Sequence, residues 1–481
     1  MQDSKQKQFA MDAVQENGNN IALLGDNIFY FAELGMQEFR TTELMTEILE
    51  QAGFEIERNI SGIPTAFIAT YGSGKPVVAL HTEFDATPSS SQMPGVAEQK
   101  AIVDGAPGHT EGHNVNAAVM IGAAVAVKKT MEQFDIQGTL RVYGAPAEEQ
   151  LVSRPYFVRD GYFKDVDVAL HDHIGSNLGT VYGLRQYALI SAEFTFKGES
   201  AHAATSPWNA RDALDAAVLM DIGWDKLREH LEPSQRSHRV ISNGGDQPNV
   251  IPNTSTIWWF FREATAEKAR ALFEKAKRVA QGAATMTDTS YSVNVLSAVA
   301  PTRCNRVLAE VIQNNIEAVG MPQWSEAEQK LVTDVQSKVN VKATGMPTQV
   351  AQLREAVQSV SANDSGDVCW VVPSGVVNFP SNIPGIAYHH WGAGVSLATT
   401  VAHKGAVAGA KTMAASAVDL LMDPELVERA RETFKEEIGG VEYRPLLPDD
   451  QQPPLELNRV LMERYRSAME AHYPKEKPAF S

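Results

Sequence analysis

Short apolar segments that end in carboxylates or histidines alternate with helix-length segments in the first part of the chain. The segments "PVVALHTEFDA" (76–86), "GTLRVYGAPAEE" (138–149) and "VDVALHDH" (166–173) have the length and composition of buried strands. The segment "NAAVMIGAAVAVKK" (116–129) has helical spacing and good helix formers. Strands that alternate with helices predict a mostly parallel α/β sheet with helices on both faces.

The rhythm changes between residues 187 and 300, where the pattern predicts strand, helix, two strands, helix and strand. This βαββαβ order is ferredoxin-like, so we expect a second, α+β domain inserted into the first. A chain of 481 residues is long enough for two domains. The apolar residues of "TSTIWWFFRE" (254–263) fit either the core of the insert or a sheet that continues across a dimer interface. The predicted boundaries are 1–186 and 301–481 for the two parts of the α/β domain and 187–300 for the insert.

Outside these segments the sequence predicts fewer elements. The chain before residue 76 reads as two amphipathic helices, and "DVCWVVPS" (367–374) reads as another strand. A helix is predicted over 401–422, whereas 325–360 has no clear pattern. We expect the Pro-rich polar tail that follows to lie on the surface and to be partly mobile.

Several histidines and carboxylates fall at the ends of predicted strands or in Gly-rich loops. The carboxyl ends of parallel strands meet at one edge of a sheet, where α/β proteins bind ligands. Each residue alone has an ordinary structural explanation, but together imidazoles and carboxylates are the ligand set for zinc, manganese or cobalt. The residues that we place at this edge are Asp85, Glu111, His113, Glu148, Glu149, His173 and the pair His389–His390.

At this point the chain resembles a known family. The motifs "HTEGHN", "GAPAEE", "HDH", "GESAHAA" and "YHHW" resemble, in order and spacing, those of the M20 metallopeptidases and amidohydrolases, in particular the aminoacylase-like branch. The resemblance spans most of the chain and is weakest over 320–360 and the C-terminal tail. It implies a zinc-peptidase-like catalytic domain, an inserted dimerisation or lid domain, and two divalent metal ions, zinc or manganese.

The resemblance also implies which residues bind the metal ions. The family's first metal-binding turn usually reads Cys-Gly-His, and here it reads Glu111-Gly112-His113. A carboxylate can bridge two ions as a thiolate does, and it favours harder ions such as manganese. The same change also fits a site that has lost a metal. The implied ligands are Glu111, His113, Glu149, His173 and His389, with His389 preferred to His390.

Other positions match catalytic residues of the family. Glu148 matches the general base, and Asp85 matches an acidic residue that we place behind a ligand imidazole. Glu83 fits either a ligand or a salt-bridged surface residue. His202, in "GESAHAA", matches a family histidine that reaches the oxygen of the scissile carbonyl, often across a dimer.

The resemblance implies hydrolysis of an N-acyl or N-aroyl amino acid by metal-activated water, with p-aminobenzoyl-glutamate as the nearest example. Asn249 and Arg262 match positions associated with the substrate's carboxylate, although Arg262 also fits an ordinary salt bridge. One alternative is a dipeptidase or aminoacylase of the same family, and another is a non-catalytic relative that acts as a partner subunit. A binding protein for acidic small molecules would leave the paired Glu148 and Glu149 unexplained.

Charge and cysteine content limit the partners and the location. The net charge of −17 disfavours nucleic acids and anionic membranes as partners. Cys304 and Cys369 cannot form a disulfide framework, and the first 20 residues lack the apolar core of a secretory signal. We therefore expect a cytoplasmic protein. The resemblance to the M20 family implies a small amide or dipeptide substrate and a homodimer formed through the inserted domain.

Overall fold

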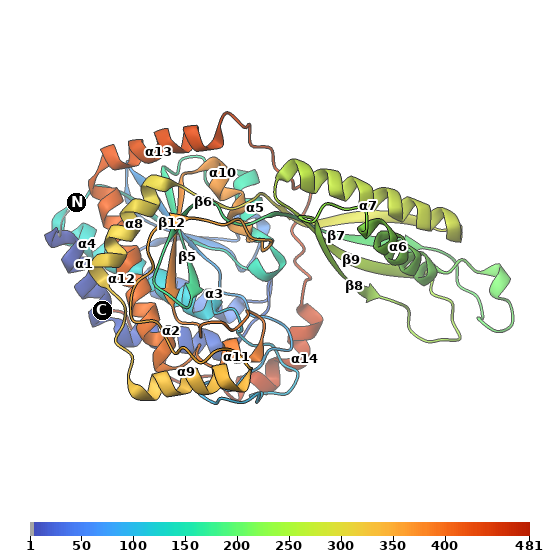
Figure 1. Cartoon of the computed structure of the whole chain (residues 1–481), viewed down its shortest axis with the longest axis horizontal. Coiled ribbons are helices and arrows are strands. Elements are labelled where there is room, and N and C mark those ends of the chain that lie inside the picture. The colour runs from blue at the N-terminus through green and yellow to red at the C-terminus, as the bar shows by residue number, and fades with distance from the viewer. Residues whose placement is uncertain (1–3) are drawn as a thin grey trace.

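A six-stranded sheet forms the centre of the larger part of the molecule (Figure 1). The computed structural model describes residues 4–481. The strand order is β1-β2-β4-β3-β5-β13. Strands β4, β3, β5 and β13 are parallel to one another, whereas β2 pairs antiparallel with both of its neighbours, β4 and β1. The mostly parallel α/β sheet is thus confirmed. The strands are β1 (Glu55–Arg58), β2 (Phe67–Ser73), β3 (Val77–Thr82), β4 (Gly138–Gly144), β5 (Val168–Gly175) and β13 (Ser374–Pro380).

Helices cover both faces of this sheet. Neighbouring residues of β3 face opposite cores, because Val78 lies in the core that contains α4 and α12, whereas Val77 lies in the core that contains α5. The many small residues of α4 permit close packing, and a side chain at Gly122 would clash with Ile21 of α2. The helices are α1 (Lys5–Glu16), α2 (Gly18–Phe31), α3 (Phe39–Gln51), α4 (His113–Phe134), α5 (Ser153–Asp160), α8 (Arg306–Val319) and α12 (Thr400–Met422).

Residues 188–299 form a separate four-stranded antiparallel sheet with two helices, which projects from the larger part of the molecule (Figure 1). The element order confirms the ferredoxin-like pattern. Ile257, Trp259 and Phe261 of β9 are buried, so one face of "TSTIWWFFRE" is core. The two edge strands of this sheet are β10 and β8, and β8 is exposed along most of its length. The elements are β7 (Ala188–Lys197), α6 (Ala213–Arg228), β8 (Arg236–Asn243), β9 (Thr254–Glu263), α7 (Ala266–Thr287) and β10 (Ser290–Val299).

The strand predicted over 367–374 is wrong. Val368–Val371 form a short helix, α10, and the strand β13 begins only at Ser374. The side chain of Asp367, just before α10, accepts hydrogen bonds from the Ala300 N–H at 3.0 Å and the Tyr443 hydroxyl at 2.6 Å. These contacts from distant segments hold a helical turn, and a short apolar run alone cannot distinguish such a turn from a strand.

The two ends of the chain are more structured than predicted. The N-terminal region contains three helices and two strands rather than two helices. The C-terminal region contains two helices, of which α14 buries Met462 and Met469 against Ala32 and Leu34. None of the helices within residues 4–481 is both long and apolar enough to span a membrane. The remaining elements are β6 (Val181–Leu184), β11 (Arg303–Cys304), α9 (Glu326–Lys338), β12 (Arg354–Glu355), α11 (Trp391–Gly394), α13 (Pro424–Ile438) and α14 (Arg459–Glu470).

Candidate active site

The predicted metal-site residues gather at the carboxyl edge of the central sheet. Asp85 follows β3, the turn 145–150 follows β4, and His173 lies near the end of β5. His113 is the first residue of α4, and His389 lies in the loop before α11. Three connections and the end of strand β5 therefore bring these side chains to one place, as the parallel strands predict.

His113 is held by a carboxylate behind it. Its Nδ1 lies 3.2 Å from Oδ1 of Asp85, and both side chains are fully buried. Gly112, which precedes it, has φ of 97°, and a side chain there would clash with Ile174. The turn therefore needs glycine, and the Asp85 contact leaves Nε2 of His113 to face the cluster.

Glu111 lies between two imidazoles. Its Oε1 is 3.4 Å from Nε2 of His173, and its Oε2 is 2.7 Å from Nε2 of His389. The same His389 nitrogen lies 3.1 Å from Oε2 of Glu149. The carboxylate that replaces the family's cysteine is thus central to the cluster and in contact with two of the predicted ligands.

Two buried atoms in this cluster have no hydrogen-bond partner within residues 4–481. They are Nε2 of His113 and Oε1 of Glu149. Ligand atoms of Glu111, His113 and Glu149 all lie within 4.8 Å of one another. An unpaired buried polar atom costs about 1–3 kcal/mol, and a coordinated cation offsets that cost. The residues present therefore fit a divalent metal ion.

The imidazoles and carboxylates strongly shift one another's pKa. Burial opposes ionisation of Glu111, but hydrogen bonds from His173 and His389 hold its pKa well below the usual value. Hydrogen bonds to Glu111 and Glu149 raise the pKa of His389 to about 10. Burial opposes protonation of His113, yet the neighbouring carboxylates outweigh it and raise its pKa well above the usual value. A cation that binds here replaces these protons.

Glu148 lies in a sharply bent turn beside the cluster. The preceding Ala147 has a left-handed backbone with φ of 57°, and its N–H donates to Oε1 of the buried Glu38 at 2.8 Å. Oε2 of Glu148 lies 3.7 Å from Nε2 of His113. Burial raises the pKa of Glu148 well above the usual value, although the charge of His113 opposes this shift. A buried carboxylate with a raised pKa suits general acid–base work.

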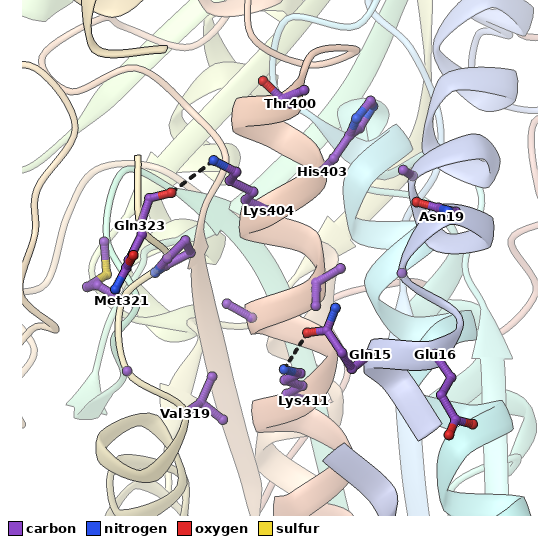
Figure 2. Close-up of a pocket in the computed structure, with 16 residues that line it drawn as sticks. Gln15, Glu16, Asn19, Val319, Met321, Gln323, Thr400, His403, Lys404 and Lys411 are labelled. Carbon is purple, nitrogen blue, oxygen red and sulfur yellow. Dashed lines mark hydrogen bonds between the residues drawn. The ribbon is translucent and has the colours of Figure 1, made fainter. Parts of the chain in front are cut away.

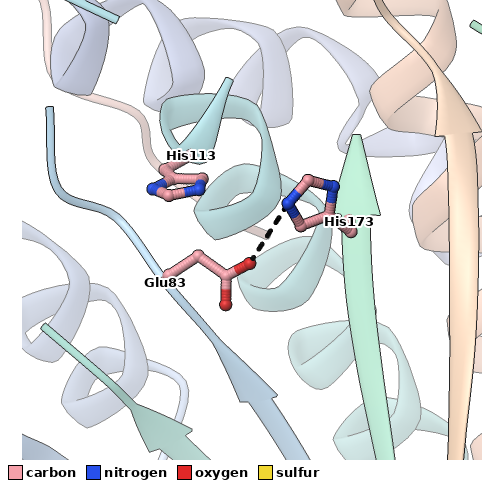
Figure 3. A group of neighbouring side chains, drawn as sticks. All are labelled: Glu83, His113 and His173. Atoms are coloured by element: carbon pink, nitrogen blue, oxygen red, sulfur yellow. Dashed lines mark ion pairs between the residues drawn. The ribbon is translucent and has the colours of Figure 1, made fainter. Parts of the chain in front are cut away.

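Glu83 is a buried ion-pair partner, so the expectation of a surface salt bridge is wrong. Its side chain is fully buried and faces His113 and His173, with Oε1 at 3.9 Å from Nε2 of His173 (Figure 3). Oε2 pairs with Arg154, and both oxygens contact Nε2 of His171 at 2.9–3.1 Å. A ligand role for Glu83 would compete with these partners.

Sequence reasoning missed Arg154, the buried cation of this region. Its Nε lies 2.8 Å from Oδ1 of Asp364, and its Nη1 lies 3.2 Å from Nδ1 of His81. In the sequence, Arg154 lies in the polar segment "SRPYFVRD" and Asp364 in the polar segment "ANDSGD". Nothing in either segment distinguishes a buried charge from a solvated one, because the pairing depends on the tertiary structure.

The three site residues predicted on the inserted domain lie at opposite ends of it. His202 and Asn249 are neighbours, since His202 bridges to Val250 and the Ala203 N–H donates to the Asn249 carbonyl at 3.1 Å. His202 follows the outer end of β7, and Asn249 precedes the start of β9. Strand β9 then runs back toward the larger part of the molecule, and Arg262 lies near its end. A strand of this length spans roughly 30 Å. Within one chain, His202 and Asn249 therefore do not join Arg262 at one ligand.

Arg262 has no ion-pair partner within residues 4–481, so the structure does not support an ordinary salt bridge. Its Nη1 makes a long hydrogen bond of 3.4 Å to the Val360 carbonyl, and Nε is buried without a partner. Burial lowers the pKa of Arg262, while the charges of Glu148 and Glu111 oppose this shift. An unpaired guanidinium that interacts with the site carboxylates is available to an anionic ligand.

A separate surface pocket of about 630 Å³ lies between α12, the α1–α2 junction and residues 319–323 (Figure 2). Both of its lysines make hydrogen bonds to other residues that line it. Nζ of Lys411 donates to Oε1 of Gln15 at 2.7 Å, and Nζ of Lys404 donates to the Gln323 carbonyl at 2.9 Å. The pocket does not include the cluster of imidazoles and carboxylates, so the candidate active site is the cluster at the sheet edge.

Known proteins share both the inserted domain and the whole fold. Residues 184–285 match the family model described as the peptidase dimerisation domain. The chain is 33% identical over 472 residues to one of the subunits of p-aminobenzoyl-glutamate hydrolase from Escherichia coli, covering 92% of this chain and 98% of the relative. It is 27% identical to the Xaa-Arg dipeptidase of Mus musculus, covering 89% and 92%.

Among solved structures, the chain is similar to the YXEP protein of Bacillus subtilis, described as a dinuclear metal-binding peptidase from the M20 family. The TM-score is 0.54 at 19% identity, over 85% of this chain and 99% of that chain. This likeness supports the fold, and the 33% identity over nearly the whole length supports the family. The chain belongs to the M20 peptidase family and is a hydrolase of that family.

Proposed function

We propose that this protein hydrolyses the amide bond of an N-acyl or N-aroyl amino acid and uses two divalent metal ions, zinc or manganese. The observation that carries the proposal is the pair of unpartnered buried atoms, Nε2 of His113 and Oε1 of Glu149, which face Glu111 beside Glu148. The Escherichia coli relative is named for p-aminobenzoyl-glutamate, so amides of this kind are the first substrates to test.

The metal ions would be held by the side chains that converge on Glu111. Asp85 accepts the Nδ1–H of His113 and so keeps Nε2 free for coordination. A divalent cation in this site supplies a bound water of lowered pKa and polarises the amide carbonyl. The donor atoms are oxygen and nitrogen without sulfur, and this set favours zinc or manganese over more thiophilic ions. The proposed ligands are Glu111, His113, Glu149, His173 and His389.

Glu148 is the proposed general base. Its Oε2 is the oxygen nearer to the ligand cluster, at 3.7 Å from Nε2 of His113. Oε2 accepts a proton from the attacking water and then delivers it to the nitrogen of the leaving amine. The burial that raises the pKa of Glu148 makes its carboxylate basic enough for the first of these transfers.

Arg262 is the proposed anchor for the carboxylate of the amino-acid product. Its guanidinium has no ion pair, and the charges of Glu148 and Glu111 act on it. A guanidinium binds a carboxylate through two parallel hydrogen bonds, which fixes the direction of the amide bond as well as its position. This role accounts for an arginine that the fold leaves without a counter-ion.

A second copy of the chain would complete the site. The outer edge of β8 is unpaired in the strand order β10-β7-β9-β8, and the inserted domain matches a peptidase dimerisation domain. A homodimer formed along this edge brings His202 and Asn249 of one copy to the active site of the other, where we propose that they bind the substrate. The exposed apolar residues on α6 and β8 that such a dimer covers are Val218, Ile222, Val240 and Ile241.

A cytoplasmic location is also part of the proposal. Cys304 and Cys369 are both buried and unpaired. Free cysteines that stay reduced are typical of a reducing compartment.

The proposal is tested by an amide screen with purified protein. The series ends in Glu, Asp, Arg or an apolar residue, and it is run before and after chelation and after addition of manganese or zinc. We expect one class to be hydrolysed, and activity to disappear on chelation and return with metal. Preference for Arg-terminated dipeptides would instead identify a dipeptidase, and no hydrolysis in any series would favour a non-catalytic partner subunit.

The variant Glu148→Gln tests the general base in the same assay. Glutamine keeps the shape of the side chain but cannot accept the proton, so we expect turnover to fall about 1,000-fold, within the range known for general bases. Metal content should not change. Turnover at the wild-type level would remove Glu148 from this role.

A further inference from the structure

Asn363 is a buried residue that contacts the proposed general base. Its Nδ2 donates to Oε1 of Glu148 at 2.7 Å, and only 2% of its surface is exposed. We propose that Asn363 is a positioning residue for hydrolysis, which holds the Glu148 carboxylate so that Oε2 alone exchanges protons with water and the leaving amine. The inference rests on the proposed function and assigns to it a residue that no sequence motif marks.

The orientation of the Asn363 amide is fixed by the hydrogen bond that its oxygen accepts. Its Oδ1 accepts the N–H of Ser365 at 2.9 Å, as the cap of the short helical turn Asp364–Gly366. A reversed amide would place an NH₂ group against that N–H and an oxygen against the Glu148 carboxylate. Both contacts would be repulsive, so the side chain can only donate to Glu148.

The turn that carries Asn363 is anchored to the segment that follows Glu148. Oδ2 of Asp364 accepts the Arg154 N–H at 3.0 Å and the Ser153 hydroxyl at 3.1 Å, and Oδ1 lies 2.8 Å from Nε of Arg154. Since Arg154 also pairs with Glu83, the turn is linked to the strand end beneath the metal cluster. The donor therefore sits on a rigid support.

This geometry decides which oxygen of Glu148 carries the proton. Oε1 accepts the N–H of Asn363, and a carboxyl oxygen that carries a proton is a weaker acceptor than the carbonyl oxygen, so this hydrogen bond favours the proton on Oε2. Oε2 is the oxygen near His113, and a proton there leaves Oε1 as an acceptor in both states of the carboxyl group. Asn363 thus keeps one hydrogen bond throughout the cycle and prevents the carboxyl group from rotating away from the substrate.

The test compares Asn363→Ala and Asn363→Asp with the wild type on the substrate found in the screen. Asp keeps the shape and the Ser365 bond but lacks the donor, and it places a second carboxylate against Glu148. We expect Asn363→Ala to lower kcat about 10- to 100-fold, the usual effect of losing a hydrogen bond to a charged group, with KM within about threefold. The kcat of Asn363→Asp should fall further than that of Asn363→Ala, and the metal content of both variants should be unchanged.

A double-variant cycle separates positioning from general damage. In the Glu148→Gln background the Asn363→Ala change should cause no further loss, because the two residues act as a unit. Asn315 provides the matched control, since it is a buried amide that donates to Oδ2 of Asp419 at 2.9 Å, away from the site. Asn315→Ala should lower the Tm to a similar extent and leave kcat unchanged.

Three results would overturn the inference. They are a wild-type kcat in Asn363→Ala, a further tenfold loss in the double variant, or a loss of metal from Asn363→Ala that accounts for the lost activity. If the wild type hydrolyses no amide in the screen, the proposed function fails and this inference fails with it. Because the wild type is measured first, the two failures are distinguishable.

Discussion

Glu111 is the residue at which this chain departs most from the usual metal-binding turn of its family. Its two oxygens face His173 and His389, so metal ions held by these imidazoles would meet oxygen rather than sulfur at this position. We predict that Glu111→Cys retains metal but shifts the preference from manganese toward zinc, because a thiolate favours softer ions. Elemental analysis after loading with equal amounts of both metals measures this shift. An unchanged preference would show that Glu111 does not set the choice of metal.

Arg154 forms ion pairs with two buried carboxylates, Glu83 and Asp364. Arg154→Met fills a similar volume but removes the guanidinium from both carboxylates, so we expect the free energy of unfolding to fall by about 3–5 kcal/mol. Urea denaturation measures this loss. The exposed Arg58, paired with Glu50 on the surface, is the control, and Arg58→Met should cost less than about 1 kcal/mol. Equal effects at the two sites would contradict the importance of the buried charge network.

Among single residues, the sequence predicted the site residues that follow strands but not the buried residues that hold them in place. Asp85, Glu148 and His173 could be placed together because parallel strands end at the same edge of a sheet. Asn363 and Arg154 could not, since each meets its partner across more than 70 residues of chain. Such contacts have no local pattern, and polar residues in loops look alike whether they end up buried or solvated.

Among the elements, α14 covers part of the catalytic domain. Met462 is 1% exposed and packs with Ala32 and Leu34 at the end of α2. We predict that Met462→Ala lowers the free energy of unfolding by about 2–5 kcal/mol, because it leaves a cavity in this small core. Val460 on the same helix is 68% exposed, so Val460→Ala should change the free energy of unfolding by less than about 0.5 kcal/mol. Urea denaturation compares them, and a neutral Met462→Ala would mean that α14 docks only loosely.

Elements with a long, regular pattern were predicted well. The strands β3, β4 and β5 of the central sheet and the βαββαβ insert follow directly from apolar runs and helical spacing, whereas β1 and β2 were not predicted. The segment 367–374 failed because its apolar run fits a strand, whereas contacts with Ala300 and Tyr443 stabilise a helical turn. The C-terminal helices escaped prediction because polar composition hides the few apolar residues, such as Met469, that anchor them.

At the scale of the whole molecule, the proposed dimer makes a prediction about shared sites. We expect a purified heterodimer of one Glu148→Gln chain and one His202→Ala chain to have about half of the wild-type activity, since the symmetry leaves one site with both residues intact. Each homodimeric variant should be far less active. Chains that carry different affinity tags allow the heterodimer to be isolated and assayed. An inactive heterodimer would place His202 at the site of its own chain and contradict the proposed arrangement.

We propose that the cluster around Glu111 binds metal ions for hydrolysis, and the number of bound ions per chain is the decisive measurement. The protein is stripped with a chelator, loaded with manganese or zinc, desalted and measured by elemental analysis beside the variant His113→Ala. We predict about two ions per chain in the wild type and fewer in the variant, as expected for a two-metal hydrolase. No retained ion in the wild type under either condition, or equal retention in the variant, would contradict it.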